Sequence, residues 1–170
     1  MKILLHTLEI YLLLFVTYAI LGWCMEVIVK FVEYKRFINR GFLIGPYCPI
    51  YGMGAVSMTL CLGGFKSNPV AVFVLGLVVA SFLEYLTSWS MEKIFHARWW
   101  DYSQDKFNIH GRICLVTMIP FGLLGLLLLY VLNPFFTKLY ESFSDNTLLG
   151  LCIAVALVSK SNLVSNCAFC

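Results

Sequence analysis

Residues 113–132 read ICLVTMIPFGLLGLLLLYVL and include no charged side chain. A helix needs about 20 mostly apolar residues to cross a hydrocarbon core of about 30 Å, so this stretch predicts a transmembrane helix. Similar stretches occupy residues 12–32, 42–62 and 69–91. A fifth, 148–164, is apolar only as far as Val158, and it spans only if the helix continues past Lys160. We therefore predict an all-α transmembrane bundle of four to five spans, forming a single membrane domain over residues 1–170.

The composition excludes several classes of protein. Of the 170 residues, 61% are hydrophobic and 12% are charged, whereas soluble domains are typically about 45–50% apolar and about 25% charged. Disordered chains are less hydrophobic than this. Nucleic-acid-binding proteins carry a dense basic patch, and a net charge of +3 provides none. The expected partner is the lipid bilayer, not a nucleic acid. The composition does not decide whether the chain forms a homo- or hetero-oligomer.

Basic residues are distributed unevenly between the two sides of the predicted bundle. One side has nine of them: Lys30, Lys35, Arg36, Arg40, Lys93, Arg98, Lys106, Arg112 and Lys160. The other side has three: Lys2, Lys66 and Lys138. Loops rich in Lys and Arg stay in the cytoplasm. We therefore predict a cell-membrane protein with its N-terminus outside and with loops 33–41 and 92–111 in the cytoplasm.

No motif in the chain predicts a metal, a cofactor or a catalytic residue. The seven cysteines include one CxxC pair, at residues 167–170, but zinc sites need two such pairs or a pair with two histidines. Residues 63–67 read GGFKS and lack the first part of a nucleotide-binding phosphate loop. The sequence therefore favours a protein that is not an enzyme.

Two segments of the chain resemble each other. Residues 23–28 read WCMEVI and residues 89–94 read WSMEKI. Each is followed by a basic loop and by an Asn, Gly and Arg cluster, at 39–41 and 108–112. With two predicted spans between the copies, both would face the same way, which is the pattern of a parallel repeat of helical hairpins.

Ionisable side chains inside the predicted spans are candidates for function, because they cost about 2.5–3.5 kcal/mol at the centre of a membrane helix on insertion scales. Glu26 and Glu84 are two of them, and Arg40 and Arg112 lie at the predicted cytoplasmic start of the following helices. We expect these four to form one cluster. One interpretation is a cavity that recognises a polar or anionic solute, and the other is a structural ion pair that fixes helix registry.

The start of the second predicted span suggests a broken helix. Pro46 and Pro49 have no N–H group for the carbonyls four residues earlier. Freed carbonyls at membrane depth are tolerated only where they are buried in protein or line a wet cavity, and broken helices mark binding sites in transporters; a simple packing kink is the alternative. The candidate site residues are thus Glu26, Glu84, Arg40, Arg112, Asn39, Asn108, Pro46, Tyr47, Pro49 and Tyr51.

Four motifs resemble those of the type IV ABC-transporter membrane proteins, the CmpB-like family of small bacterial multi-pass proteins. They are GWCMEV at 22–27, NRGFLIGPYCPIYG at 39–52, LEYLTSWSMEKIFHARWWDYS at 83–103 and FNIHGRICL at 107–115. The resemblance covers roughly residues 12–135 and implies a permease-like component of a transporter. It also implies a longer apolar last span than this chain has, because the tail becomes polar at Ser159.

Three functions are open at this point. The first is a transport component that works with a separate ATPase, since the chain has no phosphate loop of its own. The second is an intramembrane enzyme that acts on a lipid or isoprenoid, with Glu26 or Glu84 as acid or base. The third is a membrane scaffold or regulator that transports nothing.

Overall fold

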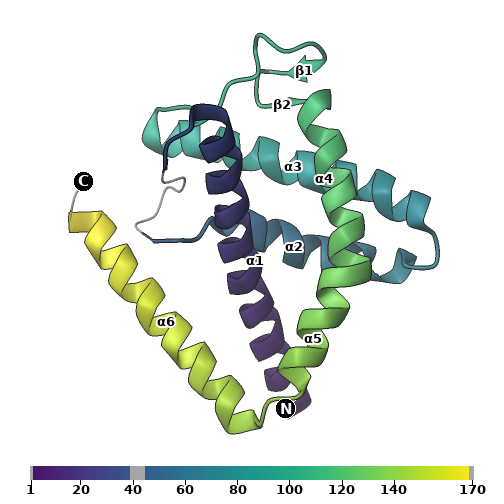
Figure 1. Ribbon diagram of the computed structural model, residues 1–170, viewed down its shortest axis with the longest axis vertical. Coiled ribbons are helices and arrows are strands. Elements are labelled where there is room, and N and C mark those ends of the chain that lie inside the picture. Colours follow the sequence, from purple (N-terminus) through teal and green to yellow (C-terminus); the bar gives the residue numbers. More distant parts are fainter. Residues whose placement is uncertain (1, 39–44, 169–170) are drawn as a thin grey trace. The chain divides into compact units, whose positions relative to one another are not determined.

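A computed structural model describes residues 2–38 and 45–168 of the chain, and these are mainly helical (Figure 1). The elements are α1 (Lys2–Tyr34), α2 (Pro49–Leu62), the 3-10 turn η1 (Gly63–Phe65), α3 (Pro69–Phe95), β1 (Asn108–Ile109), β2 (Ile113–Cys114), α4 (Leu115–Leu127), the π-helix η2 (Leu128–Leu132), α5 (Asn133–Glu141) and α6 (Asp145–Ala168). The helical fold class is confirmed, with one small antiparallel pair of strands added.

Three helical segments are long and apolar enough to cross a membrane: Ile3–Tyr34, Pro69–Phe95 and Leu115–Glu141. They correspond to the predicted spans 12–32, 69–91 and 113–132, and each continues past the predicted end. The apolar helices Pro49–Phe65 and Asp145–Val158 are shorter than a span. The length and apolar composition of these helices indicate a membrane protein. The number of four to five spans stays a prediction.

The predicted second span, 42–62, is helical only from Pro49 onward among its described residues. Proline is favoured at the first position of a helix, where its missing N–H would have no partner anyway. Before it, Gly45 has φ +148°, a conformation that L side chains rarely adopt, and the Cys48 N–H donates to the Ala19 carbonyl at 2.9 Å. Pro49 is thus the first residue of α2, and the broken helix expected over 42–62 stays a prediction because residues 42–44 lie outside the described residues.

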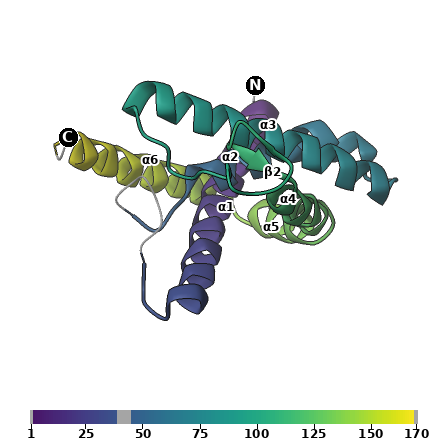
Figure 2. The same cartoon turned by 90° about the horizontal axis from the view of Figure 1, so that it is seen from above.

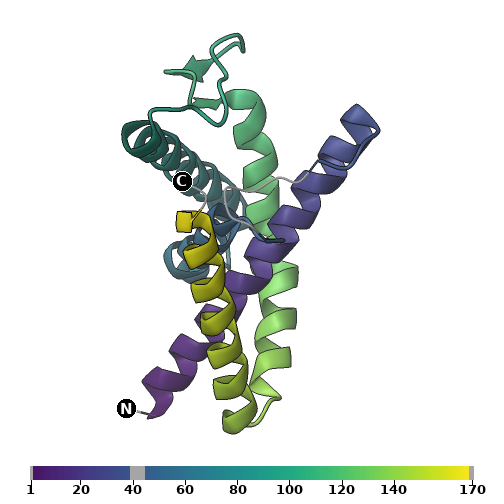
Figure 3. The same ribbon diagram turned by 90° about the vertical axis from the view of Figure 1, so that its left-hand side faces the viewer.

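The predicted span 113–132 also differs in its limits. Its first residues, Ile113 and Cys114, form β2 and pair with the two residues of β1. Helix α4 accommodates Pro120, and the helical segment continues through η2 into α5 without a break (Figure 3). π-Helix occurs mostly as single turns inside α-helices, and here it shortly precedes Pro134, which has no N–H to donate to a carbonyl.

The described contacts divide the chain into two compact units, residues 1–56 with 135–170, and residues 57–134. In the first unit, Leu13 of α1 packs against Leu148 and Cys152 of α6 in an apolar core. The Thr17 and Tyr140 hydroxyls lie 2.5 Å apart. Glycine also permits a close crossing of α1 and α2, because the Tyr51 ring lies directly against Gly22.

The second unit is built on the contact between α3 and α4, which cross each other in Figure 1. Glycines allow the two backbones to approach: a Cβ atom added to Gly76 would lie 3.8 Å from the Gly122 Cα. Small residues at crossing points are the usual way for membrane helices to pack closely. The segment between the two helices carries β1 and β2 and leads from the end of α3 to the start of α4 (Figure 2).

Candidate functional site

One face of α3 carries a row of buried polar side chains. Ser81, Glu84 and Ser88 are spaced by three and four residues, so they share a face of the helix. All three are more than nine-tenths buried, and Glu84 is only 6% exposed. Buried polar groups in a membrane-length helix are costly unless they find partners. The partners come from the segment that follows α3.

That segment is held against α3 by an ion-pair network around Glu92. The Glu92 carboxylate accepts from Arg98 Nε at 3.1 Å and from Arg112 Nη2 at 2.5 Å. Arg112 is itself buried, and its Nη1 donates to the Ser88 hydroxyl at 3.2 Å. One arginine thus joins the row of polar side chains to the carboxylate at the end of the helix.

The local sequence explains why the segment returns to the helix. His96 ends α3 in the left-handed conformation, with φ +52°. Asp101 accepts hydrogen bonds from the Ser103 backbone and hydroxyl, which lower the pKa of the Asp101 carboxyl. Gly111, at φ +68°, turns the chain back, and its carbonyl accepts from the Tyr102 N–H at 2.8 Å. These turns are formed by local contacts, and they position the side chains of Trp100 and Tyr102.

Trp100 and Tyr102 complete the cluster. The Trp100 indole N–H donates to the Arg112 carbonyl at 3.0 Å, which fixes the backbone beside the buried guanidinium. The Tyr102 hydroxyl donates to Glu84 Oε1 at 3.1 Å. Glu84 precedes Glu92 by eight residues, which is about 12 Å along a helix. The segment after α3 therefore extends along the helix toward its middle.

Two atoms of the polar row lack a partner among the residues that the structure describes. Glu84 Oε2 and Ser81 Oγ are both buried and make no hydrogen bond there. They belong to side chains one turn apart on the same face of α3. A buried carboxylate oxygen left in this way costs about 1–3 kcal/mol or more. The pair is thus placed to accept a proton, a water or a polar group of a ligand.

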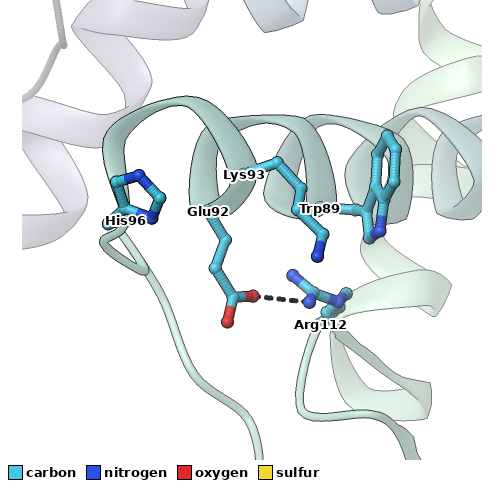
Figure 4. Close-up of a pocket in the computed structure, with 5 residues that line it drawn as sticks. All are labelled: Trp89, Glu92, Lys93, His96 and Arg112. Atoms are coloured by element: carbon cyan, nitrogen blue, oxygen red, sulfur yellow. Dashed lines mark ion pairs between the residues drawn. The ribbon is translucent and has the colours of Figure 1, made fainter.

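A polar pocket of about 380 Å³ lies at the end of α3. Figure 4 shows the Glu92–Arg112 ion pair beside it, with side chains from the last turns of α3, from His96 just after it and from Arg112 just before β2. The residues that line it are Trp89, Glu92, Lys93, His96 and Arg112. It is open to the surface and lies on the part of α3 beyond Ser88.

In the first unit, the structure brings together two predicted site residues. The Tyr51 hydroxyl donates to Glu26 Oε1 at 2.5 Å. Asn39 and Arg40 lie outside the described residues. The single cluster expected from Glu26, Glu84, Arg40 and Arg112 therefore stays a prediction, because its members fall in different units or outside the described residues.

The other predicted residues have local roles. The Asn108 side chain donates to the Asp105 carbonyl and accepts from the Gly111 N–H, so it shapes the turn. Pro46 and Tyr47 precede α2, and the Tyr47 N–H donates to the Gly45 carbonyl. None of these contacts assigns a ligand, so their part in a binding site stays a prediction.

Among the described residues, the carboxylate that pairs with Arg112 is Glu92. Sequence reasoning missed Glu92 and Tyr102 as site residues. The signal for Glu92 was present, because WSMEKI places it where WCMEVI has Glu26. No signal pointed to Tyr102, since its approach to Glu84 depends on how the segment folds back.

Comparison with known families agrees with this architecture. The family model described as "Putative ABC-transporter type IV" matches residues 13–166. The chain belongs to this family. The match extends past the residues 12–135 that carry the visible motifs and includes most of α6. No curated protein and no solved structure matches the chain. Within the described residues, no group of three His, Cys, Asp or Glu side chains is placed to hold a metal ion.

Proposed function

We propose that the protein is the membrane-embedded permease component of an ABC-type transporter that works with a separate ATPase. The family membership supports a transporter-related membrane protein, and the sequence contains no phosphate loop with which this chain could bind ATP. In this proposal the five predicted helices span the membrane as two related hairpins and a last helix. The N-terminus lies outside, and the segment after α3 faces the cytoplasm and the ATPase.

The observation that carries the proposal is the unfilled hydrogen-bonding capacity of Glu84 inside a membrane-length helix. In a purely structural arrangement, the buried carboxylate would be paired by the nearby guanidinium. Arg112 instead bonds to Ser88 and Glu92. Ionisable side chains within membrane helices most often mark solute or proton pathways. We therefore assign Glu84, with Ser81 beside it, to contact the transported polar solute or its coupling proton.

The first test is affinity purification of the tagged protein in mild detergent, with the bound proteins identified by mass spectrometry. The expected result is co-purification of an ATPase that has a phosphate loop. Recovery of the protein without any ATPase, from cells in which the membrane fraction is intact, contradicts the proposal. A scaffold or an intramembrane enzyme gives that second result.

The second test compares Glu84→Gln with Glu141→Gln. Glutamine can still accept from the Tyr102 hydroxyl, so Glu84→Gln removes the charge and keeps the contact. Glu141 is an exposed glutamate at the end of α5 and serves as the matched control. If Glu84 contacts solute or protons, its variant accumulates and unfolds like the control, and the ATPase activity of the purified complex no longer responds to its substrate. A loss of stability with normal coupling supports a structural role instead.

A further inference from the structure

Helix α3 has a second face that the proposed transport site does not use. Val78, Phe82, Leu86 and Trp89 follow at intervals of four, four and three residues, so they form one stripe along the helix. Their exposed fractions are 58%, 64%, 41% and 45%. The row of Ser81, Glu84 and Ser88 lies on the other side of the same helix and is buried. The stripe is therefore an apolar surface open to lipid.

Lys93 follows Trp89 by four residues and continues this stripe into the polar pocket at the end of α3. Figure 4 shows the Lys93 ammonium group and the Arg112 guanidinium reaching toward the same pocket. The Glu92 carboxylate is already engaged by two arginines. Lys93 forms no ion pair with any residue that the structure describes. The pocket thus has one cation more than its own carboxylates can neutralise.

An apolar groove lies at the other end of the stripe. It has a volume of about 320 Å³. The residues that line it are Ser57, Cys61, Val78, Val79, Phe82 and Leu83. Phe82 belongs both to the groove and to the stripe, so the apolar surface is continuous from the groove to Trp89. Phe82 precedes Lys93 by eleven residues, or about 16 Å along the helix, which is close to half of a hydrocarbon core of about 30 Å.

We propose that this surface binds an anionic phospholipid, with the phosphate in the pocket of Lys93 and Arg112 and an acyl chain along the stripe to Phe82. Basic pockets at the ends of membrane helices bind acidic lipid head groups, and tryptophan settles at the boundary between head groups and chains. The carbonyl groups at the end of α3 and the Glu92 carboxylate are negative and repel an anion. The positive charge of Lys93, added to that of Arg112, offsets this repulsion, so the site requires Lys93.

A lipid fits this surface better than a soluble phosphate does. A soluble anion would contact only the polar pocket. Its binding would not explain why an exposed apolar stripe ends at that pocket. The length of the stripe matches one leaflet, and its charge excess favours an acidic head group over a zwitterionic one. The inference does not depend on transport, since it concerns the outward face of α3.

The test measures lipid binding to the purified protein in detergent. The probes are dioctanoyl phosphatidylglycerol, dioctanoyl phosphatidylcholine, glycerophosphoglycerol without acyl chains, and inorganic phosphate. The expected Kd for phosphatidylglycerol is at least tenfold lower than for phosphatidylcholine, and the two probes without chains bind much more weakly. Equal binding of the two lipids overturns the proposal. Binding of inorganic phosphate as tightly as phosphatidylglycerol also overturns it, in favour of a soluble anion.

Three variants locate the site. Lys93→Gln is expected to raise the Kd for phosphatidylglycerol about fivefold, since a basic residue near a membrane surface contributes about 1 kcal/mol to acidic-lipid attraction. Lys93→Arg keeps the charge and should bind within twofold of the native protein. Lys106→Gln removes a charge from the segment after α3, outside the pocket, and should have no effect. Equal effects of Lys93→Gln and Lys106→Gln would show general attraction to the protein's charge and overturn the site.

Discussion

The crossing of α1 and α2 gives the sharpest test of the packing. A Cβ atom at Gly22 would lie 2.2 Å from Cγ and 2.5 Å from Cβ of Tyr51. These atoms are next to the Tyr51 backbone, so no rotamer change can remove the clash. The Gly22→Ala variant must therefore separate the two helices, and it also moves the Tyr51 hydroxyl away from Glu26.

The expected cost follows from three effects. Overpacking a close contact typically costs about 1–3 kcal/mol, and losing a hydrogen bond to a charged group costs about 1.5–3 kcal/mol. Replacing glycine by alanine inside a helix returns about 1 kcal/mol. We expect Gly22→Ala to lower the free energy of unfolding by about 1.5–5 kcal/mol.

The assay is reversible unfolding in mixed detergent micelles, followed by far-UV circular dichroism. Gly150→Ala is the matched control, because a Cβ atom there meets nothing within 4 Å, and it should stabilise the protein by up to about 1 kcal/mol. A Tyr51→Phe variant separates the hydrogen bond from the clash, which must persist in the Gly22→Ala, Tyr51→Phe double variant. If Gly22→Ala is as stable as Gly150→Ala, the close crossing of α1 and α2 is refuted.

Three further predictions concern the topology and the turns. Single cysteines at Lys35 and Gln104, in a cysteine-free protein, should resist an impermeant thiol reagent in whole cells and react after lysis; labelling at both positions in intact cells reverses the orientation. Arg112→Lys should destabilise the protein by about 1 kcal/mol, because lysine cannot reproduce both contacts of the buried guanidinium, whereas thermal unfolding of the more exposed Arg98→Lys should change little. Pro49→Ala should destabilise by about 0.4–1 kcal/mol, because proline at the first helical position restricts the unfolded chain; a clear stabilisation in the same assay contradicts this position.

The sequence was sufficient where local chemistry decides the structure. The uninterrupted apolar run of 113–132 predicts a membrane helix by length alone, and the helix is present, although it begins at Leu115. Glu26 is a candidate as an ionisable group inside a predicted span and Tyr51 as part of the expected broken helix, and the structure joins them by a hydrogen bond. The start of α2 was also readable in principle, because Pro49 fits the first position of a helix better than an interior one.

The partner of Arg112 could not be read from the sequence, because it depends on the path of the segment after α3. That path requires left-handed backbone at four residues, which are His96, Phe107, His110 and Gly111. Glycine adopts this conformation freely and histidine more often than most residues do, but Phe107 has no such preference. At His110 a contact with α3 accompanies this conformation, because the Tyr85 hydroxyl lies 2.9 Å from the His110 Nδ1 atom. The depth of the residues in their helices therefore did not point to Glu92 as the partner of Arg112.

The two faces of α3 explain why one helix carries so much of the candidate chemistry. Its buried face is polar and its exposed face is apolar, which is the reverse of a helix in a soluble protein and suits a helix that meets lipid on the outside. Among the described residues, Arg112 bonds to the buried row through Ser88 and also lines the polar pocket. A negative charge in that pocket would compete with Glu92 for this guanidinium. Because the same side chain also bonds to Ser88 in the buried row, an anion bound in the pocket would act on that row through Arg112.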